Sequence, residues 1–534
     1  MKRFGDSVKG VLAICKPLRW RICVSVLIGL VRVAASLGFV WACKLLVDAA
    51  TGAADSQPVA GIPLFAGTML LQLLCDLAAS YWENLTTIKA QNALRYKTFS
   101  HVLRSSWTGK EDYHSADVMN RMQEDIRVVT DLVCSRIPDT VVTLCQLAAA
   151  SAYLMYLSPG LMWILVSLTA AAVLGSKLLF RKLRALTAKV RELDSASNRH
   201  MQENLQNRVL VLTLTGIENV LHKLKLVQDD IEEAVIDRLD YTTFARAVMG
   251  LGFRAGYAAA FLWGIFGIAG GTVTYGMMIS FLQLVGQIQR PIADMSRHIP
   301  ACIQALASEE RITELTGMKE DIPLEGPLLE SAPSIEFKDV TFSYPGQVRK
   351  VLDNFSHTFT SGTFTAVTGP TGSGKSTMAR LAMGLLKPEE GSVSRIPVCN
   401  FMYVPQGNSL LSGTIRDNLL LANPNASEEA ISQALHAADA DFVFNLPDGP
   451  DCVCGEGGTG LSEGQAQRVS IARALLHPGN VLILDEATSS LDSDTENRVL
   501  ERLVAGYGGR KTVIFISHRE RVLSFADSIL KIPA

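Results

Sequence analysis

The chain has 534 residues, of which 48% are hydrophobic and 19% charged, and its formal net charge is -2. This length exceeds one compact domain and predicts about two or three, and the apolar composition indicates a membrane part. The near-neutral charge argues against a nucleic-acid partner, because binding a phosphate backbone requires a basic face.

Apolar residues are concentrated in the first ~320 residues, whereas the last ~200 are typical of a soluble α/β domain. Six apolar runs in the first part are long enough, or nearly so, to cross a bilayer as helices of about 20 residues. The alternative, buried helices of a large soluble protein, fits less well because the runs are so long and numerous. The predicted spans are Ile22–Lys44, Ile62–Trp82, Ile137–Leu157, Leu161–Leu179, Ala245–Ala269 and Val273–Ile292.

Loop charges predict the orientation of these spans. The segments after the first, third and fifth spans contain no Lys or Arg; they are Val47–Gly61, Leu157–Gly160 and Gly270–Gly276. The N-terminal segment and the connections on the other side are rich in both residues. Basic loops stay on the cytoplasmic side, so we expect both termini in the cytoplasm. Further spans follow the first run without a clear cleavage site, which favours a retained span over a signal peptide.

The two cytoplasmic connections, Glu83–Arg136 and Arg181–Phe244, are very long for loops. Repeated charges and few Gly or Pro predict helices instead, so the spans are expected to continue outside the bilayer. Within the first connection, the stretch Asp112–Arg121 contains Ser115, a candidate N-cap of a helix. An ordinary solvated turn is the alternative for this stretch.

Ionisable residues inside spans are costly, so each is a candidate for a transport pathway or an ion pair. Arg32 lies in the first span, Asp76 in the second and Arg254 in the fifth. An Arg32–Asp76 ion pair is as good an explanation as substrate contact. The sixth span carries a polar face, explained equally by a water-filled cavity or by helix–helix hydrogen bonds. This face is formed by Gln283, Gln287 and Arg290.

A Pro- and Glu-bearing stretch, 318–333, has the composition of a linker. It divides the chain into a predicted transmembrane domain with cytoplasmic helical extensions, 1–317, and a second domain, 334–534. Alternation from Ser334 to Phe342 predicts that the second domain opens with a strand.

A glycine-rich loop follows the next predicted strand, Thr363–Thr368, and precedes a helical pattern. It fits GxxxxGK[ST], whose backbone N–H groups close around phosphate oxygens at a helix N-terminus. Lys375 is expected to reach the β- and γ-phosphates, and the Ser376 hydroxyl to ligate Mg²⁺. Taken alone, the motif predicts only a P-loop nucleotide binder. The predicted contacts to ATP are Gly369, Thr371, Gly372, Gly374, Lys375, Ser376 and Thr377.

The segment Asn480–Glu486 reads as a buried apolar strand that ends in two carboxylates. Asp485 is expected to hold Mg²⁺, directly or through water, and Glu486 to act as base toward the attacking water. The alternative is that two acids merely cap a solvated strand end. The P-loop upstream favours the acidic half of a nucleotide site.

The segment Gly460–Arg468 resembles the signature sequence of ATP-binding cassette (ABC) proteins. In that family the residues equivalent to Ser462 and Gly464 approach the γ-phosphate from the partner subunit, with Gln465 beside them. The commonest form has a glycine where this chain has Glu463, at a position that varies in the family. Function is expected to survive this departure.

Other residues match the family's motifs in the expected order. Tyr344 resembles the aromatic residue that stacks on adenine, and Asp492 lies in a segment similar to the D-loop. Gln406 resembles the Q-loop glutamine that senses Mg²⁺, and His518 the switch histidine at the γ-phosphate. The resemblance therefore implies a catalytic set of Glu486, His518 and Gln406, and a metal set of Ser376, Gln406 and Asp485.

The first part of the chain is similar to the exporter type of the same family. Ala116–Met122 resembles the region around the first coupling helix, and Gly455–Gly458 an element that precedes the signature in exporters. The implied fold is an α-helical six-span transmembrane domain followed by an α/β P-loop NTPase domain. Two departures are a shortened spacing between Lys375 and Gln406 and the end of the chain soon after His518, without the usual closing helices. Both leave every catalytic position present.

The resemblance implies ATP-driven transport of an unidentified substrate, in the direction of export, by a dimer of half-transporters in a bacterial inner membrane. Its cofactors would be ATP and Mg²⁺, and its partners a second half-transporter, the lipid bilayer and the substrate. Import by the same architecture and a non-transporting membrane sensor are the alternatives. Lipid, peptide, drug-like compound and metal chelate all remain open as substrates.

The ten cysteines contain no CxxC pair, and several lie in apolar runs. A cysteine in such a run behaves as a small hydrophobic residue. The pattern predicts reduced structural cysteines and no metal site formed by cysteines.

Overall fold

The computed structural model describes residues 10–533, except 12–13, 15, 54–60, 106–114, 319, 321–325, 347–348, 395 and 408, and except the side chains of 115–116, 172–173, 175–181, 292–299 and 456. The chain forms two compact units. A helical unit comprises Met1–Tyr96 and Asn120–Thr313, and an α/β unit comprises Lys97–Met119 and Glu314–Ala534.

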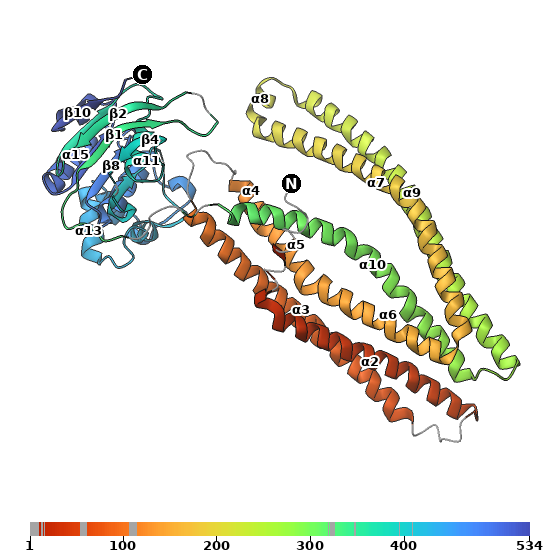
Figure 1. The fold of residues 1–534 in the computed structure, drawn as a ribbon. Helices are drawn as coiled ribbons and strands as arrows, with labels where there is room; N and C mark the ends of the chain where they lie inside the picture. Colours follow the sequence, from red (N-terminus) through yellow and green to blue (C-terminus); the bar gives the residue numbers. More distant parts are fainter. Residues whose placement is uncertain are drawn as a thin grey trace. The chain divides into compact units, whose positions relative to one another are not determined.

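Long helices dominate the chain before residue 317 (Figure 1). From the start of α4 to the end of α6 the helix is continuous, with two π-helical turns, η3 and η4. The elements are η1 (Lys16–Leu18), α2 (Arg19–Ala50), α3 (Ile62–Arg104), α4 (Ser115–Asn120), η3 (Arg121–Asp125), α5 (Ile126–Asp131), η4 (Leu132–Arg136), α6 (Ile137–Leu157), α7 (Pro159–Gln206), α8 (Arg208–Thr213), α9 (Ile217–Ala269) and α10 (Tyr275–Thr316).

Five of the six predicted spans lie entirely on α2, α3, α6, α7 or α9, and the sixth begins two residues before α10. Four stretches in the described part of the chain are long and apolar enough to cross a membrane: Lys16–Ala50, Ile62–Arg104, Asp117–Leu157 and Ile217–Ala269. A shorter apolar segment, Pro159–Ala171, begins α7. Helices α7 and α10 include side chains outside the described set, so their spans stay predictions.

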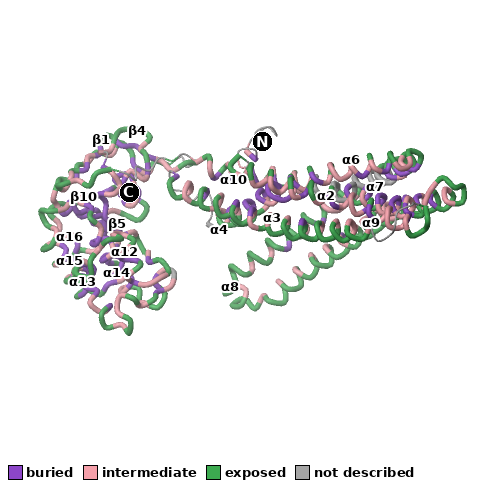
Figure 2. The backbone as a smooth tube through the Cα atoms, turned by 90° about the horizontal axis from the view of Figure 1, so that it is seen from below, coloured by how far each residue is buried: buried purple, intermediate pink, exposed green. Residues whose placement is uncertain are grey.

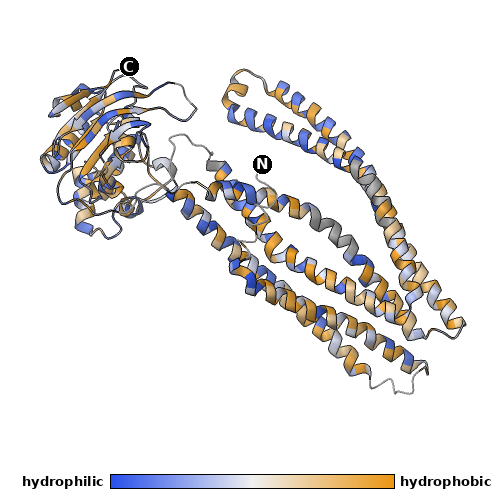
Figure 3. Ribbon diagram, in the orientation of Figure 1, coloured by the Kyte–Doolittle hydropathy of each residue, from blue (hydrophilic) through white to orange (hydrophobic). Residues whose placement is uncertain are grey.

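Helices α3, α7 and α9 continue well beyond the predicted spans that they carry. That these extensions lie outside the bilayer stays a prediction. Helices α7 and α9 pack against each other and are joined through the short α8. Figure 3 shows apolar residues along α2, α3 and α6, and more polar residues on α7 and α9 toward α8. The predicted cap Ser115 is the first residue of α4, and the residues 112–114 of the same prediction lie outside the described residues.

The α/β unit is built on a five-stranded parallel sheet of order β10-β3-β9-β8-β5, with a three-stranded antiparallel sheet of order β2-β1-β4 and the small pair β6-β7. Its strands are β1 (Ile335–Phe342), β2 (Leu352–Phe359), β3 (Phe364–Thr368), β4 (Glu390–Val393), β5 (Phe401–Val404), β6 (Gly413–Thr414), β7 (Val453–Cys454), β8 (Val481–Asp485), β9 (Thr512–Ile516) and β10 (Ser528–Lys531). Part of the predicted linker, 319 and 321–325, lies outside the described residues.

Helices cover the parallel sheet and bury its central strands. Every residue of β8 and β9 is buried, as a sheet with both faces covered requires. Figure 2 shows this buried interior of the α/β unit. The helices and helical turns are α11 (Lys375–Ala382), η5 (Val398–Asn400), α12 (Ile415–Leu420), α13 (Glu428–Ala437), η6 (Asp441–Asn445), η7 (Gly449–Asp451), η8 (Glu456–Gly458), α14 (Glu463–Leu476), α15 (Ser493–Tyr507) and α16 (Glu520–Ser524).

Candidate nucleotide-binding site

The sheet topology brings four predicted motifs to one edge. Strands β3, β9, β8 and β5 are all parallel, so their carboxyl ends meet at the same side of the sheet, where ligands bind in open α/β folds. The glycine-rich loop follows β3, Asp485 ends β8, and Gln406 and His518 follow β5 and β9. These motifs are far apart in the sequence and adjacent in the fold.

The glycine-rich loop has backbone angles that demand glycine. Gly374 is the N-cap of α11 with a φ of 92°, and a Cβ there would lie 2.9 Å from the Val351 Cγ1 atom. The Lys375 ammonium donates to the carbonyl oxygens of Gly369 and Pro370 at 2.7 and 2.9 Å. The buried Ser373 hydroxyl has no hydrogen-bond partner among the described residues. A left-handed loop at a helix N-terminus with an unused hydroxyl suits an anion such as a phosphate.

Asp485 is a buried carboxylate, with 2% of its surface exposed. Burial raises the pKa of this carboxyl group, the nearby Glu486 charge acts in the same sense, and a hydrogen bond with Ser376 opposes it. The Tyr403 hydroxyl donates to Asp485 at 3.5 Å, and burial raises the pKa of that tyrosine to about 12. A buried carboxylate beside a hydroxyl has the hard oxygen ligands that Mg²⁺ prefers.

Glu486 has a left-handed backbone, with a φ of 51°, which is strained for a residue with a side chain. Its carboxylate accepts a hydrogen bond from the Gln406 amide at 2.7 Å and lies 3.6 Å from the His518 Nε2 atom. The three residues of the predicted catalytic set are therefore in contact. Strain held in place by surrounding contacts is typical of functional positions.

Tyr344 follows β1 of the antiparallel sheet and contacts α11, the helix that follows the glycine-rich loop. Its hydroxyl lies 2.9 Å from the Thr377 hydroxyl and accepts a hydrogen bond from Arg380 at 3.3 Å. Its ring packs edge-on against Phe342, with centroids 5.1 Å apart. The predicted adenine contact thus lies beside the glycine-rich loop in the fold.

The signature residues begin α14. Ser462 is the N-cap, and a capping box links it to Gln465: the Gln465 N–H donates to the Ser462 hydroxyl at 3.2 Å, and the Ser462 N–H to the Gln465 amide oxygen at 2.9 Å. Gly464 packs against the D-loop, since a Cβ there would lie 3.0 Å from the Ser490 carbonyl oxygen. Within the described residues, no hydrogen bond or ion pair joins Ser462, Gly464 or Gln465 to the glycine-rich loop.

Asp492 of the D-loop caps α15. Its carboxylate accepts from the backbone N–H groups of Asp494 and Thr495 at 3.1 and 3.0 Å. The Thr495 hydrogen bonds are the main reason that the pKa of Asp492 falls to about 2. This carboxylate is therefore ionised at physiological pH.

Sequence reasoning missed a buried network that joins the D-loop to the histidine loop. Arg519, next to His518, donates to the carbonyl oxygens of Leu491 and Ser489 at 3.1 and 2.6 Å and to the Glu496 carboxylate at 3.0 Å. Glu496 is 1% exposed and also accepts from the Thr488 hydroxyl at 2.6 Å. No local pattern marks these residues, because the network forms only when β8, α15 and β9 come together.

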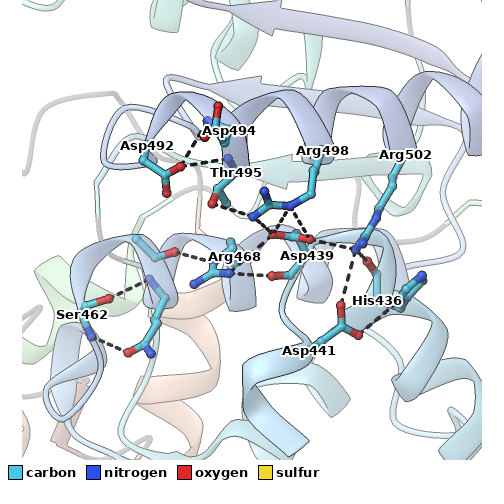
Figure 4. A network of polar contacts seen from close by, with 12 residues as sticks. His436, Asp439, Asp441, Ser462, Arg468, Asp492, Asp494, Thr495, Arg498 and Arg502 are labelled. Carbon is cyan, nitrogen blue, oxygen red and sulfur yellow. Dashed lines mark hydrogen bonds and ion pairs between the residues drawn. The ribbon is translucent and has the colours of Figure 1, made fainter. Parts of the chain in front are cut away.

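A second missed network surrounds Asp439 (Figure 4). The Arg468 guanidinium on α14 donates to the Asp439 carbonyl oxygen at 2.7 Å, and two arginines of α15, Arg498 and Arg502, contact its carboxylate at 3.0 and 3.1 Å. Asp439 is buried and has a left-handed backbone, with a φ of 54°. It therefore ties the signature helix to the D-loop helix. The only sequence signal is the spacing of Arg498 and Arg502, which places both on one face of a helix.

Comparison with known proteins agrees with this geometry. The model of the ABC transporter transmembrane region matches residues 22–292, and the ABC transporter model matches residues 352–489. The chain belongs to the ABC transporter family. Membership confirms the predicted fold class and implies ATP binding by the α/β unit, which we call the cassette from here on.

Two relatives match this ABC transporter over nearly its whole length, and a third matches about half of it. An uncharacterized ABC transporter ATP-binding protein, y4gM of Sinorhizobium fredii, is 28% identical over 92% of this chain and 86% of its own length. The glutathione/L-cysteine transport system protein CydC of Escherichia coli is 28% identical over 97% and 94%. The mycobactin import protein IrtB of Mycobacterium tuberculosis is 37% identical over 49% and 47%.

A solved structure shares the fold of this ABC transporter. The structure of a bacterial Atm1-family ABC exporter with ATP bound has a TM-score of 0.77 and covers 96% of this chain and 93% of its own, at 24% sequence identity. The half-transporter fold, with a multi-pass helical membrane part joined to one cassette, is thereby confirmed.

Proposed function

We propose that this ABC transporter hydrolyses ATP and uses the energy to export a substrate, as a dimer of two half-transporters. The observation that carries the proposal is the cluster at the sheet edge, where Gln406 and His518 both contact Glu486. Glu486 accepts the proton of the attacking water, and the two neighbours orient its carboxylate. His518 is then placed to contact the γ-phosphate.

The glycine-rich loop holds the phosphates in this mechanism. Lys375 moves from the carbonyl oxygens of its own loop to the phosphate oxygens, an exchange that compensates for the lost hydrogen bonds. The backbone N–H groups of Gly369, Thr371, Gly372 and Gly374 and the side chain of Thr377 complete the cradle. Tyr344 stacks on the adenine.

Ser376, Gln406 and Asp485 would hold Mg²⁺, and the buried carboxylate beside the Ser376 hydroxyl fits a hard cation. When bound, the ion neutralises charge on the β- and γ-phosphates. Asp485 supplies the negative charge that positions it.

In the proposed mechanism, a second chain completes each site. The signature residues Ser462, Gly464 and Gln465 make no described contact with the glycine-rich loop of their own chain. With Asp492, they complete the site of a partner half-transporter, whether a second copy or a related chain.

The exporter-type fold of the solved neighbour supports export, and the loop charges support cytoplasmic termini in the inner membrane of a bacterium. The similar proteins differ in direction, since one relative is named for the import of mycobactin and the solved structure is an exporter. Import and a non-transporting sensor are therefore outcomes that the test must separate.

The test is ATP hydrolysis by the purified chain in lipid, beside Glu486→Gln and the control Glu501→Gln on the exposed face of α15. We expect Glu486→Gln to lose turnover by about 10²–10⁴-fold, the usual contribution of a general base, while it still binds ATP. Glu501→Gln should match the parent. Parent-like turnover in Glu486→Gln would contradict the assignment of the base.

Vesicle experiments then separate the alternatives. A compound that stimulates hydrolysis and moves away from the cassette side supports export, and movement toward that side shows import. Stimulation without movement of any compound shows a sensor. Weakened ATP binding in Lys375→Ala supports the phosphate role of that residue, and unchanged affinity contradicts it.

A further inference from the structure

The helical unit contains a polar cavity of about 590 Å³. Its walls come from α2, α3, α6 with the preceding turn η4, and α10, all within one compact unit. This volume suits a small-molecule ligand, since such pockets measure about 300–1,000 Å³. The lining residues are Arg32, Val33, Ser36, Gln72, Asp76, Glu83, Arg136, Asp139, Thr143, Gln146, Arg290 and Pro291.

The cavity has an unusual balance of charge. Three of its lining residues are arginines and three are carboxylates, and amides and hydroxyls fill most of the remaining wall. The Arg32 guanidinium lies 3.4 Å from the Asp76 carboxylate, a long ion pair whose two side chains are 37% and 59% exposed. Arg290 forms no ion pair with any described residue. Charges inside membrane spans are costly and mark pathways, and four of these six lie in predicted spans: Arg32, Asp76, Asp139 and Arg290.

Next to this wall, Gln287 of α10 carries acceptors without partners among the described residues. Pro291 has no N–H, so it cannot donate to the backbone carbonyl of Gln287 as a residue inside a helix normally would. The Gln287 side chain donates to the Ser36 hydroxyl at 2.8 Å and fixes that lining group, while its own amide oxygen has no partner in the described part of the chain. Irregular backbone at membrane depth is tolerated where it borders a cavity.

These groups define the chemistry of the ligand. Guanidinium groups bind carboxylates by paired, charge-assisted hydrogen bonds, and carboxylates bind ammonium groups. A lipophilic compound would desolvate the charges of this wall and offer them no polar group in exchange, at high cost. A solute with one sign of charge would match only half of the wall.

We propose that the cavity binds a hydrophilic zwitterion of the amino-acid or short-peptide class, with its carboxylate at Arg290 and its ammonium at Asp76. This assignment rests on the proposed transport function and names its substrate class. Arg32, paired with Asp76, aligns the carboxylate that receives the ammonium group. Of the substrate classes open from the sequence, it selects peptide over lipid, drug-like compound and metal chelate.

Binding is tested on the full chain in lipid nanodiscs with four probes. They are triglycine, acetyl-triglycine without the ammonium, triglycinamide without the carboxylate, and the lipophilic cation tetraphenylphosphonium. Five of the six tryptophans belong to the helical unit, so their fluorescence chiefly reports binding and thermal unfolding of the unit that holds the cavity. Triglycine should bind at least about tenfold more tightly than either blocked peptide, the loss expected for one charge-assisted pair. Tighter binding of tetraphenylphosphonium than of triglycine would overturn the proposal.

Variants tie the binding to the cavity. Arg290→Gln and Asp76→Asn should each weaken triglycine binding by about tenfold. Arg254→Gln is the matched control, because Arg254 also lies in a predicted span but does not line the cavity. If a single variant fails to fold, the exchanged pair Arg32→Asp with Asp76→Arg keeps the charge balance and removes the carboxylate at position 76. It should therefore weaken triglycinamide binding more than acetyl-triglycine binding. Equal binding to parent and all variants would overturn the proposal.

Measurements of ATP hydrolysis and of triglycine binding separate the substrate class from the proposed function. Hydrolysis that depends on Glu486, with no triglycine binding or movement, would overturn the substrate class and leave the ATP-driven transporter standing. Triglycine binding without hydrolysis that depends on Glu486 would support the cavity and contradict the assigned catalytic base.

Discussion

The cassette and the helical unit bury their residues in different ways. In the cassette, every residue of β8 and β9 is buried, and charged side chains such as Asp485 and Glu496 are enclosed with hydrogen-bond partners. In the four apolar helical stretches, only 11–17% of the most apolar window is buried within the chain. Figure 2 shows the contrast between the two units. The cassette buries its apolar residues within the chain, whereas the membrane helices leave apolar surface exposed to contact lipid or another chain.

The two units also pack with different residues. The cassette core consists of large aliphatic and aromatic side chains such as Ile335, Phe359 and Phe515. The helices approach each other through glycines: a Cβ at Gly29 of α2 would lie 2.3 Å from Val142 of α6, and one at Gly264 would lie 2.7 Å from Met278. Small residues at helix contacts are typical of membrane proteins, in which dispersion at close approach replaces the hydrophobic effect. A charge change should therefore be most costly in the cassette, and a size change in the helical unit.

The largest effect is expected from Asp439→Ala in the cassette. The change leaves Arg468, Arg498 and Arg502 without their shared carboxylate, and it puts alanine in a left-handed conformation. Because the arginines are partly exposed, we expect a loss near the lower end for a broken buried pair, about 3 kcal/mol. Hydrogen exchange of cassette peptides in the full chain measures it.

Asp439→Asn is the matched control, since asparagine tolerates the left-handed backbone and keeps an oxygen acceptor. It should cost much less than alanine. Exchange of α14 and α15 should rise together in Asp439→Ala, and a change confined to one helix would contradict the tie between them.

The local motifs of the cassette were predictable from the sequence, and its long-range networks were not. The glycine-rich loop and the strand ending in Asp485 follow from residue spacing, because a turn and the helix after it impose local rules. The contact of Gln406 and His518 with Glu486 was anticipated only through the family resemblance. Asp439 and Arg519 act across separate elements, so no sequence pattern distinguishes them from surface charges.

In the helical unit the positions of helices were predictable, and their irregularities were not. Apolar length alone anticipates the spans, because a bilayer requires backbone groups to be satisfied within each helix. Apolar length does not mark the π-helical turns η3 and η4, in which Met122 and Val133 are buried in the folded chain. The Arg32–Asp76 pair was one of two explanations from the sequence, and the structure shows both the pair and a cavity beside it.

A size change at a helix contact should give an intermediate effect. Gly29→Val inserts a side chain against Val142, which is itself branched at Cβ and has little freedom to move. Overpacking of this kind costs about 1–3 kcal/mol. Thermal unfolding followed by tryptophan fluorescence should show a lower Tm.

Gly67→Val provides the matched control, because no atom lies within 4 Å of a Cβ at that position. It makes the same chemical change on α3 at an open site. An equal loss of Tm in both variants would show that helix propensity, and not packing, determines the effect. It would contradict the expectation that the helical unit is sensitive to the size of side chains at helix contacts.

The smallest effect concerns pH and belongs to the cassette. His477 follows α14, and burial, with a smaller contribution from the Lys511 charge, lowers the pKa of its imidazole. Its Nδ1 atom accepts a hydrogen bond from the Gly479 N–H at 3.1 Å, which protonation of Nδ1 would abolish. The folded pKa lies below the unfolded value of about 6.5. The stability that neutral His477 contributes is therefore complete above about pH 6.5, and it is lost as the pH falls from there through the folded pKa.

His477→Asn keeps an acceptor for the Gly479 N–H and cannot take up a proton, so it should reduce the acid sensitivity of the cassette. Exchange of α14 peptides should match the parent at pH 8 and rise less than in the parent between pH 6.5 and pH 5. His357, whose pKa burial also lowers, remains in the variant, so part of the pH dependence should persist. An unchanged pH dependence would show that His477 stays neutral or becomes charged equally in both states. The helical unit, followed by tryptophan fluorescence, should show no difference between parent and variant at any pH, because each unit carries its own core and its own response to charge.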